Sequence, residues 1–250
     1  MNNFFYVVNI IKLNAIGSTN SYLVDLSKTS ALDDFTVVIA NQQTKGRGQQ
    51  GAVWQSVANK SLTFSVFKAF EHLSINQVSS IAFAVSLGLL KTLDKYQIPD
   101  ISIKWPNDIM SQSKKMAGIL IENKIKQRRV VSSIIGIGLN VNQEKFEKLP
   151  QASSLYLAGH KKLNVNDVFE RLLEALVRQL NRVEKVDIST LKEEYESFLF
   201  RKKMVSVFED TTGNRFNGII RGVSTEGQLI VEIDQQGHQT FQPKELKLLF

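Results

Sequence analysis

Two apolar segments joined by a short polar turn constrain the fold of this chain more than any other feature. Residues 117–122 and 130–139 both have strand-forming composition, and the simplest connection through residues 123–129 is a β-hairpin. Strand patterns also occur in three earlier segments, residues 35–40, 61–67 and 101–105. Helical patterns interrupt these strands without the strict strand-helix-strand alternation of a parallel sheet. The sequence therefore predicts an α+β fold.

Three segments place apolar side chains at helical spacing. They are residues 75–96, 167–183 and 190–200, and the third has Glu193 at the position of a capping box. After Phe200 the pattern changes to short β-rich runs separated by glycine turns: residues 204–208, 216–223, 228–233 and 238–242. These runs predict a small antiparallel barrel. The predicted domains are residues 1–201 and 202–250.

Composition excludes several kinds of chemistry. The chain has no cysteine, which removes disulfides, thiolate zinc sites and cysteine nucleophiles. Its three histidines are far apart in the sequence, which disfavours a histidine-built metal site and a Ser-His-Asp triad. The formal charge of +7 favours an anionic partner without choosing among nucleotides, acidic proteins and nucleic acid. No apolar run approaches the roughly 20 residues of a membrane span, and residues 1–13 lack signal-peptide features, so we expect a cytoplasmic protein with no membrane partner.

The glycine-rich segment Gly46-Arg47-Gly48-Gln-Gln-Gly51 matches the G-x-G-x-x-G pattern. A dinucleotide-binding turn requires a helix after the glycines, but the next predicted element is a strand. The glycines instead allow the backbone to approach an anion, and Lys45 and Arg47 supply charge. A simple turn remains the alternative interpretation.

Ser18-Thr19-Asn20 follows a short strand around Leu13 and precedes an apolar run that begins at Tyr22. Such a segment is typical of a helix N-cap. The same three polar side chains can also line a pocket and bind a neutral polar ligand group, and spacing does not decide between the two.

The segment Lys104-Trp-Pro-Asn-Asp108 is more specific. Tryptophan and proline at the end of a strand predict a rigid exit that aims Asn107 and Asp108 in a fixed direction. A lysine suits a phosphate group, while Asn and Asp oxygens suit magnesium. Lys115 follows within one short loop, and its alternative interpretation is a solvated lysine like its neighbour Lys114. Together these residues indicate activation of an acid by ATP.

The motifs occur together, and in order they resemble those of the bacterial biotin protein ligases over nearly the whole chain. The matching segments are Ser18-Thr-Asn20, Gln43 before Gly46-Arg-Gly48, Trp54, Lys104-Trp-Pro-Asn-Asp108, Lys115-Met-Ala-Gly118 and Gly136-Ile-Gly-Leu-Asn140. The resemblance implies a class II synthetase-like catalytic fold, in which a mixed central sheet is flanked by helices, and a C-terminal SH3-like barrel. It also implies a ligase that forms biotinyl-5′-AMP from biotin and ATP with Mg²⁺, then transfers biotin to a lysine of a biotin carboxyl carrier protein.

The resemblance also implies a role for each matching residue. The implied catalytic residues are Lys115, Arg47, Asp108 and Lys104. The implied biotin-binding residues are Ser18, Thr19, Asn20, Gln43, Arg47, Gly48, Gln49, Lys115 and Gly118. The implied ATP or adenylate-binding residues are Gly46, Arg47, Trp54, Lys104, Asn107 and Asn140. Asn107 and Asp108 are the implied metal ligands, and residues 46–51 form the implied lid.

One departure from the family pattern lies in this lid. Many relatives have a second arginine two positions after the first and another basic residue before the tryptophan, where this chain has Gln49 and Ala52. The adenylate would lose charge-assisted contacts.

Other functions and partners remain open at this point. A lipoate or octanoate ligase or transferase of similar fold is one alternative, and a non-catalytic biotin or nucleotide sensor is another. Some relatives carry an N-terminal winged helix-turn-helix, but 17 residues precede Ser18 here, so we expect no DNA binding. A homodimer is possible, as in relatives.

Overall fold

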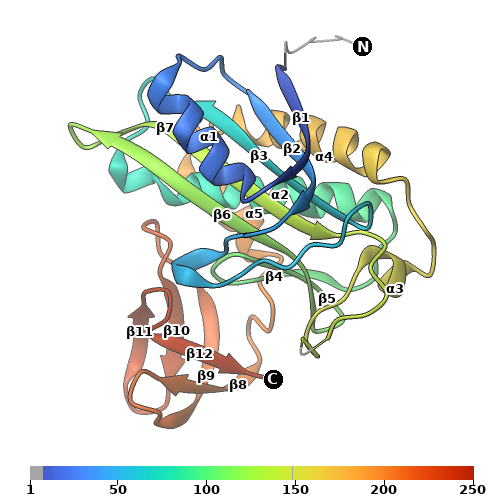
Figure 1. Ribbon diagram of the computed structural model, residues 1–250. Coiled ribbons are helices and arrows are strands. Elements are labelled where there is room, and N and C mark those ends of the chain that lie inside the picture. Colours follow the sequence, from blue (N-terminus) through green and yellow to red (C-terminus); the bar gives the residue numbers. More distant parts are fainter. Residues whose placement is uncertain (1–7, 148) are drawn as a thin grey trace.

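The computed structural model describes residues 8–147 and 149–250 and contains two β-sheets (Figure 1). The larger sheet has seven strands in the order β1-β2-β3-β7-β6-β5-β4. β1 and β2 are parallel, and the other neighbours in this sheet are antiparallel. The bounds are β1 Ile10–Ile16, β2 Val37–Gln43, β3 Ser61–Ala69, β4 Ile101–Lys104, β5 Asp108–Ser111, β6 Lys114–Lys126 and β7 Arg129–Asn140. The α+β fold and the β6-β7 hairpin predicted from the sequence are confirmed.

Helices cover both faces of the central sheet (Figure 1). The bounds are α1 Thr19–Thr29, α2 Ser79–Lys95, α3 Leu155–Gly159, α4 Val165–Leu180 and α5 Ile188–Glu196. α1 packs against one face, where its Leu23 joins a small core with Val38 and Ile134. The adjacent residues Val37 and Ile135 belong to the large core under α2 and α4. Successive strand residues point to opposite faces, so β2 and β7 contribute to both cores.

The helices that form the large core have clear sequence causes. α4 buries its apolar residues along one face, from Val168 to Leu180, and the Asn164 side chain caps its first turn. In α2, Gly88 allows close approach to α4, because an added Cβ would lie 3.0 Å from Leu176 Cδ2. β3 is more buried than its alternating pattern predicts, since Thr63 and Ser65 are buried together with their apolar neighbours.

The C-terminal segment forms a second, antiparallel sheet. Its five strands have the order β11-β10-β9-β8-β12. The bounds are β8 Val205–Asp210, β9 Arg215–Val223, β10 Leu229–Ile233, β11 Gly237–Phe241 and β12 Leu246–Leu249. The antiparallel prediction is confirmed, but a closed barrel is not, because the edge strands β11 and β12 do not pair with each other within the described residues.

Polar contacts join the C-terminal sheet to the rest of the chain. The Trp105 indole Nε1 donates a hydrogen bond to the Gly227 carbonyl at 2.8 Å. The Glu196 carboxylate accepts one from the Val223 amide at 2.9 Å and pairs with Lys202 at 3.0 Å. The division into domains at residue 201 stays a prediction.

All three predicted helices have somewhat different bounds in the structure, and the third also has a different N-cap. The helix expected at residues 190–200 is α5, which begins at Ile188 with Asp187 as its N-cap. The Asp187 side chain accepts from the Ser189 amide, so it takes the place that the capping-box prediction gave to Thr190. The helix ends at Glu196, before Phe200. Across the described part of the chain, none of the helices has both the length and the apolar character needed to span a membrane.

Candidate active site

A cavity of about 540 Å³ lies where the central sheet meets the C-terminal sheet. Its wall includes these residues predicted from the sequence: Ser18, Thr19, Asn20, Gln43, Arg47, Gly48, Gln49, Trp54, Lys104, Asn107, Asp108, Lys115 and Gly118. The C-terminal sheet adds apolar side chains such as Phe208 and Leu246, together with Lys247. The structure thus brings most of the predicted site residues to one cavity.

Two predicted residues lie behind this wall. Gly46 is packed against the loop itself, since an added Cβ would lie 2.3 Å from the Trp54 carbonyl oxygen. Asn140 is buried at the end of β7 and donates to the Ser153 carbonyl at 3.0 Å. Both therefore support the site from outside the cavity.

Neutral polar groups line the end of the cavity at the start of α1. The Thr19 amide and hydroxyl both donate to Gln43 Oε1, at 2.8 and 3.1 Å. The Thr19 hydroxyl also lies 2.7 Å from the Ser65 hydroxyl, and Ser65 donates to Asn20 Oδ1 at 2.5 Å. Ser18 caps α1 while lining the cavity, so the capping and pocket interpretations hold together. This network can orient a neutral polar ligand group.

Sequence reasoning missed Ser65 as part of this network. The residue lies on β3, 45 positions from Asn20, and the alternation of apolar and polar residues in this strand indicates a solvated position for it. Its pairing partner in the sheet is Gly136, at which an added Cβ would lie 2.1 Å from Asn20 Oδ1. The small residues Ser65 on β3 and Gly136 on β7 were the available sign that another side chain, Asn20, packs over this pair.

Trp54 lies on a floor of glycines. A Cβ at Gly138 would be 2.2 Å from the Trp54 ring, and one at Gly118 would be 3.1 Å from it. The indole Nε1 is buried and has no hydrogen-bond partner among the described residues. A buried unpaired donor is costly, so this group is available for a ligand acceptor.

Charged groups gather at another part of the cavity wall, where β4 ends and β5 and β6 begin. Lys115 Nζ lies 2.6 Å from Asp108 Oδ1, and 5.7 Å from the centre of the Trp54 ring. Burial lowers the pKa of Lys104, and the charges of Lys115 and Lys247 lower it further, while Asp108 opposes them. Lys104 and Lys115 thus both lie beside the single Asp108 carboxylate, which leaves a positive field suited to a carboxylate or phosphate group.

The link between β4 and β5 holds this charged end in place. A cis peptide joins Trp105 to Pro106. Asn107 donates through its side chain to the Ile119 carbonyl at 2.9 Å and accepts from the Ile119 amide at 3.0 Å through its backbone. Asn107 therefore ties this segment to β6, and Asp108 faces Lys115.

The proposed metal ligands do not form a protein-held ion site. The Asp108 carboxylate is paired with Lys115, and the Asn107 amide group is bonded to β6. No group of three or more His, Cys, Asp or Glu side chains suited to a metal ion occurs in residues 8–147 and 149–250. Magnesium normally requires several oxygen ligands in near-octahedral geometry, so these residues do not fit an ion bound by protein alone.

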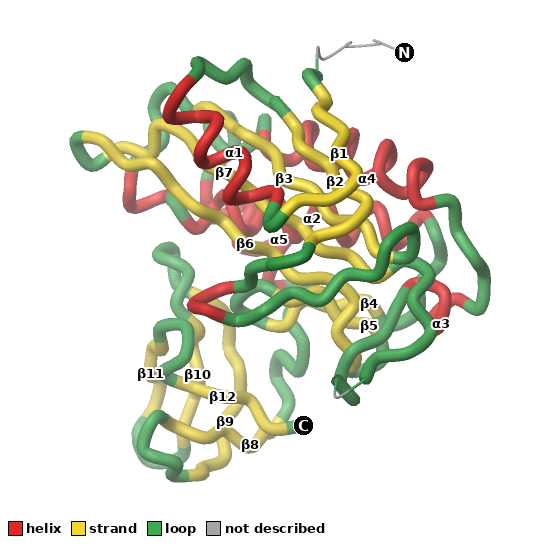
Figure 2. Tube along the Cα trace, in the orientation of Figure 1, coloured by secondary structure: helices red, strands yellow, loops and turns green. Residues whose placement is uncertain are grey.

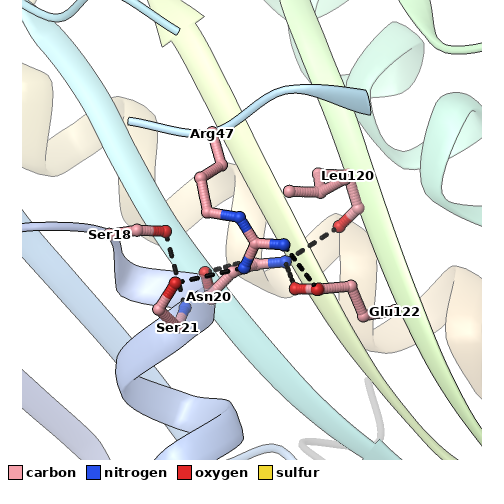
Figure 3. Close-up of polar contacts among 7 residues, drawn as sticks. Ser18, Asn20, Ser21, Arg47, Leu120 and Glu122 are labelled. Carbon is pink, nitrogen blue, oxygen red and sulfur yellow. Dashed lines mark hydrogen bonds and ion pairs between the residues drawn. The ribbon is translucent and has the colours of Figure 1, made fainter. Parts of the chain in front are cut away.

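The glycine-rich loop between β2 and β3 crosses the sheet on the side of the C-terminal strands (Figure 2). It forms a small hairpin, in which the Trp54 amide donates to the Gly46 carbonyl and the Gly48 amide donates to the Ala52 carbonyl. Arg47 extends from this hairpin toward α1 and β6, where it contacts Ser21 and Glu122 (Figure 3).

Fold and site together define an α+β protein with one cavity lined by both a neutral polar network and a lysine cluster. The chain matches the model of the Biotin/lipoate A/B protein ligase family over residues 13–140, just over half of its 250 residues. It is 30% identical over 220 residues to the biotin--[acetyl-CoA-carboxylase] ligase of Mycobacterium tuberculosis, covering 87% of this chain and 80% of that protein. It is 26% identical over 245 residues to the bifunctional ligase/repressor BirA of Bacillus spizizenii, covering 96% of this chain and 74% of that protein.

Solved structures give the same result. The biotin protein ligase from Aquifex aeolicus, in complex with biotin and ATP, superposes with a TM-score of 0.75 at 28% identity, covering 96% of this chain and 98% of that one. This chain belongs to the biotin/lipoate A/B protein ligase family.

Proposed function

We propose that this chain is an ATP-dependent biotin protein ligase. One observation carries the proposal: a single cavity joins the neutral network around Thr19, Gln43 and Asn20 to the lysines around Asp108. The neutral end suits the ureido ring of biotin. The charged end suits its carboxylate and the phosphates of ATP.

In the first proposed step, a carboxylate oxygen of biotin attacks the α-phosphorus of ATP. The bond from this phosphorus to the pyrophosphate oxygen breaks, which gives biotinyl-5′-AMP and pyrophosphate. Lys115 stabilises the negative charge that grows on the α-phosphate, and Lys104 holds the phosphates. For this role, the Lys115 ammonium must either leave Asp108 and contact the substrate or contact both groups at once. We assign magnesium to the ATP phosphates, because the protein ligands do not fit an isolated ion.

In the second proposed step, a lysine amine of a biotin carboxyl carrier domain attacks the biotinyl carbonyl. The carbon-oxygen bond to AMP breaks, an amide forms and the amine loses its proton. Asp108 is our candidate for orienting or deprotonating this amine. The loop at residues 46–51 shields the adenylate from water, and Trp54 is our candidate for packing on adenine. Cytoplasmic location and homodimer formation stay predictions from the sequence.

Exchange of labelled pyrophosphate into ATP tests this function. We expect exchange that depends on biotin and does not occur with lipoate. Exchange with lipoate alone would identify a lipoate ligase instead, and biotin binding without exchange would identify a sensor.

The composition of the lid predicts that biotinyl-AMP dissociates readily from this chain. Gln49 lines the cavity where many relatives have arginine, so the adenylate lacks one cationic contact. We expect Gln49→Arg to slow release of biotinyl-AMP by about tenfold, the effect of one charge-assisted contact. Rapid-dilution measurement of adenylate release from the two proteins checks this expectation. Equal dissociation rates would remove Gln49 from the explanation.

A further inference from the structure

Glu122 connects two segments that carry predicted ligand-binding residues. Its Oε1 accepts from Arg47 Nη2 at 2.9 Å, and its Oε2 accepts from Asn20 Nδ2 at 2.9 Å (Figure 3). Arg47 comes from the glycine-rich loop, Asn20 from the start of α1 and Glu122 from β6. One carboxylate therefore fixes the position of two side chains that line the cavity.

The position of Glu122 is itself fixed by the sheet. β6 pairs with β7, and Glu122 lies opposite Ile134. The Leu120 carbonyl on the same strand accepts a second bond from Asn20 Nδ2 at 3.3 Å. With Ser65 on its Oδ1, the Asn20 amide is bonded at both ends. Its orientation toward the cavity thus depends on β6.

Arg47 is also held by side-chain hydrogen bonds, but some of its N–H donors are not used by them. Its Nη1 donates to the Ser21 hydroxyl at 3.1 Å and its Nη2 donates to Glu122. A guanidinium has five N–H donors, so an anion in the cavity can bind the remaining ones without breaking the pair with Glu122.

The Arg47–Glu122 ion pair contributes more to the orientation of the Arg47 side chain than to the stability of the fold. Its side chains are 47% exposed at Arg47 and 31% at Glu122, and exposed ion pairs add little to stability. Glu122 lies behind Arg47 and Asn20 and is absent from the described residues that line the cavity. It can affect a ligand only through these two residues.

We infer that Glu122 is a positioning residue for the ligase reaction: it holds Arg47 and Asn20 in the orientation that receives biotin. The inference rests on the proposed function. It assigns a role to a side chain outside the cavity wall, which no motif in the sequence indicated.

The substitution Glu122→Gln tests the role. The glutamine keeps an oxygen for Asn20 but removes the negative charge opposite Arg47. In biotin-dependent pyrophosphate exchange we expect kcat/KM for biotin to fall about tenfold, mainly through KM, as for coupled neighbouring groups. Glu174→Gln is the matched control, because it removes an exposed glutamate that pairs with Arg178 on α4, and its kinetics should equal those of the wild type.

A double-mutant cycle separates positioning from a general structural effect. If Glu122 acts through Arg47, Glu122→Gln should have little further effect on kcat/KM in an Arg47→Ala background. Equal fold losses in both backgrounds, or no loss in the wild-type background, would overturn the inference while leaving the ligase function intact. Absence of biotin-dependent exchange in the wild-type chain would contradict the proposed function and the inference together. Thermal unfolding of each variant verifies that all remain folded.

Discussion

Replacing Lys115 with alanine is expected to lower the rate of biotin adenylation by about 100- to 1,000-fold, the usual cost of removing one group that stabilises transition-state charge. Lys115 lies 2.6 Å from Asp108 and lines the cavity beside Trp54. Its charge acts most strongly when negative charge develops on the α-phosphate, so kcat should fall more than KM rises. Single-turnover formation of biotinyl-AMP measures this directly.

Lys114→Ala is the control for this experiment. Lys114 is the adjacent lysine on β6, and its side chain is exposed. The Lys114→Ala substitution removes the same charge from the same strand but should leave the rate of adenylation unchanged. Near-normal turnover in Lys115→Ala, with the protein folded, would remove Lys115 from its assigned role.

Replacing Gly136 with alanine is expected to lower kcat/KM for biotin by about 10- to 100-fold, the cost of a displacement near 1 Å. The new Cβ would lie 2.1 Å from Asn20 Oδ1, so the Asn20 side chain must move. This movement breaks its bond with Ser65 and weakens its contacts with Glu122 and Leu120. The polar side chains around Asn20 would no longer be correctly oriented for the ligand, while the lysine cluster would stay in place.

Biotin titration by calorimetry measures the effect of Gly136→Ala apart from catalysis. Gly17→Ala is the matched control, because a Cβ there would meet no atom closer than Lys45 Cβ at 4.0 Å. An unchanged biotin affinity in Gly136→Ala would show that the polar network around Asn20 does not bind the ligand.

The sequence predicted the fold where the signal is local. Long apolar runs identified the β6-β7 hairpin, and helical spacing identified α2 and α4. β5 was missed because it has only four residues, the first of which ends the Lys104–Asp108 motif, and it is a strand because β4 and β6 pair with it on both sides. α3 and β12 are also short, and their positions depend on tertiary contacts.

The sequence predicted which residues line the cavity, but it did not predict which partners their side chains contact. Resemblance to a family identified Arg47 and Asn20, yet their shared partner Glu122 lies 75 positions from Arg47 and 102 from Asn20. Trp54 is an expected adenylate-binding residue, and its packing on Gly138 could not be inferred from the sequence. Side-chain direction depends on partners that are distant in the sequence, which spacing alone does not reveal.

The fate of the biotin carboxylate oxygens tests the central claim most directly. Biotin labelled with a heavy oxygen isotope in its carboxylate would be incubated with ATP, the chain and a biotin carboxyl carrier domain, and the released nucleotide analysed by mass spectrometry. Attack on the α-phosphorus followed by aminolysis transfers one labelled oxygen to AMP, and this is the result we predict. Unlabelled AMP, or release of ADP, would contradict the adenylate mechanism.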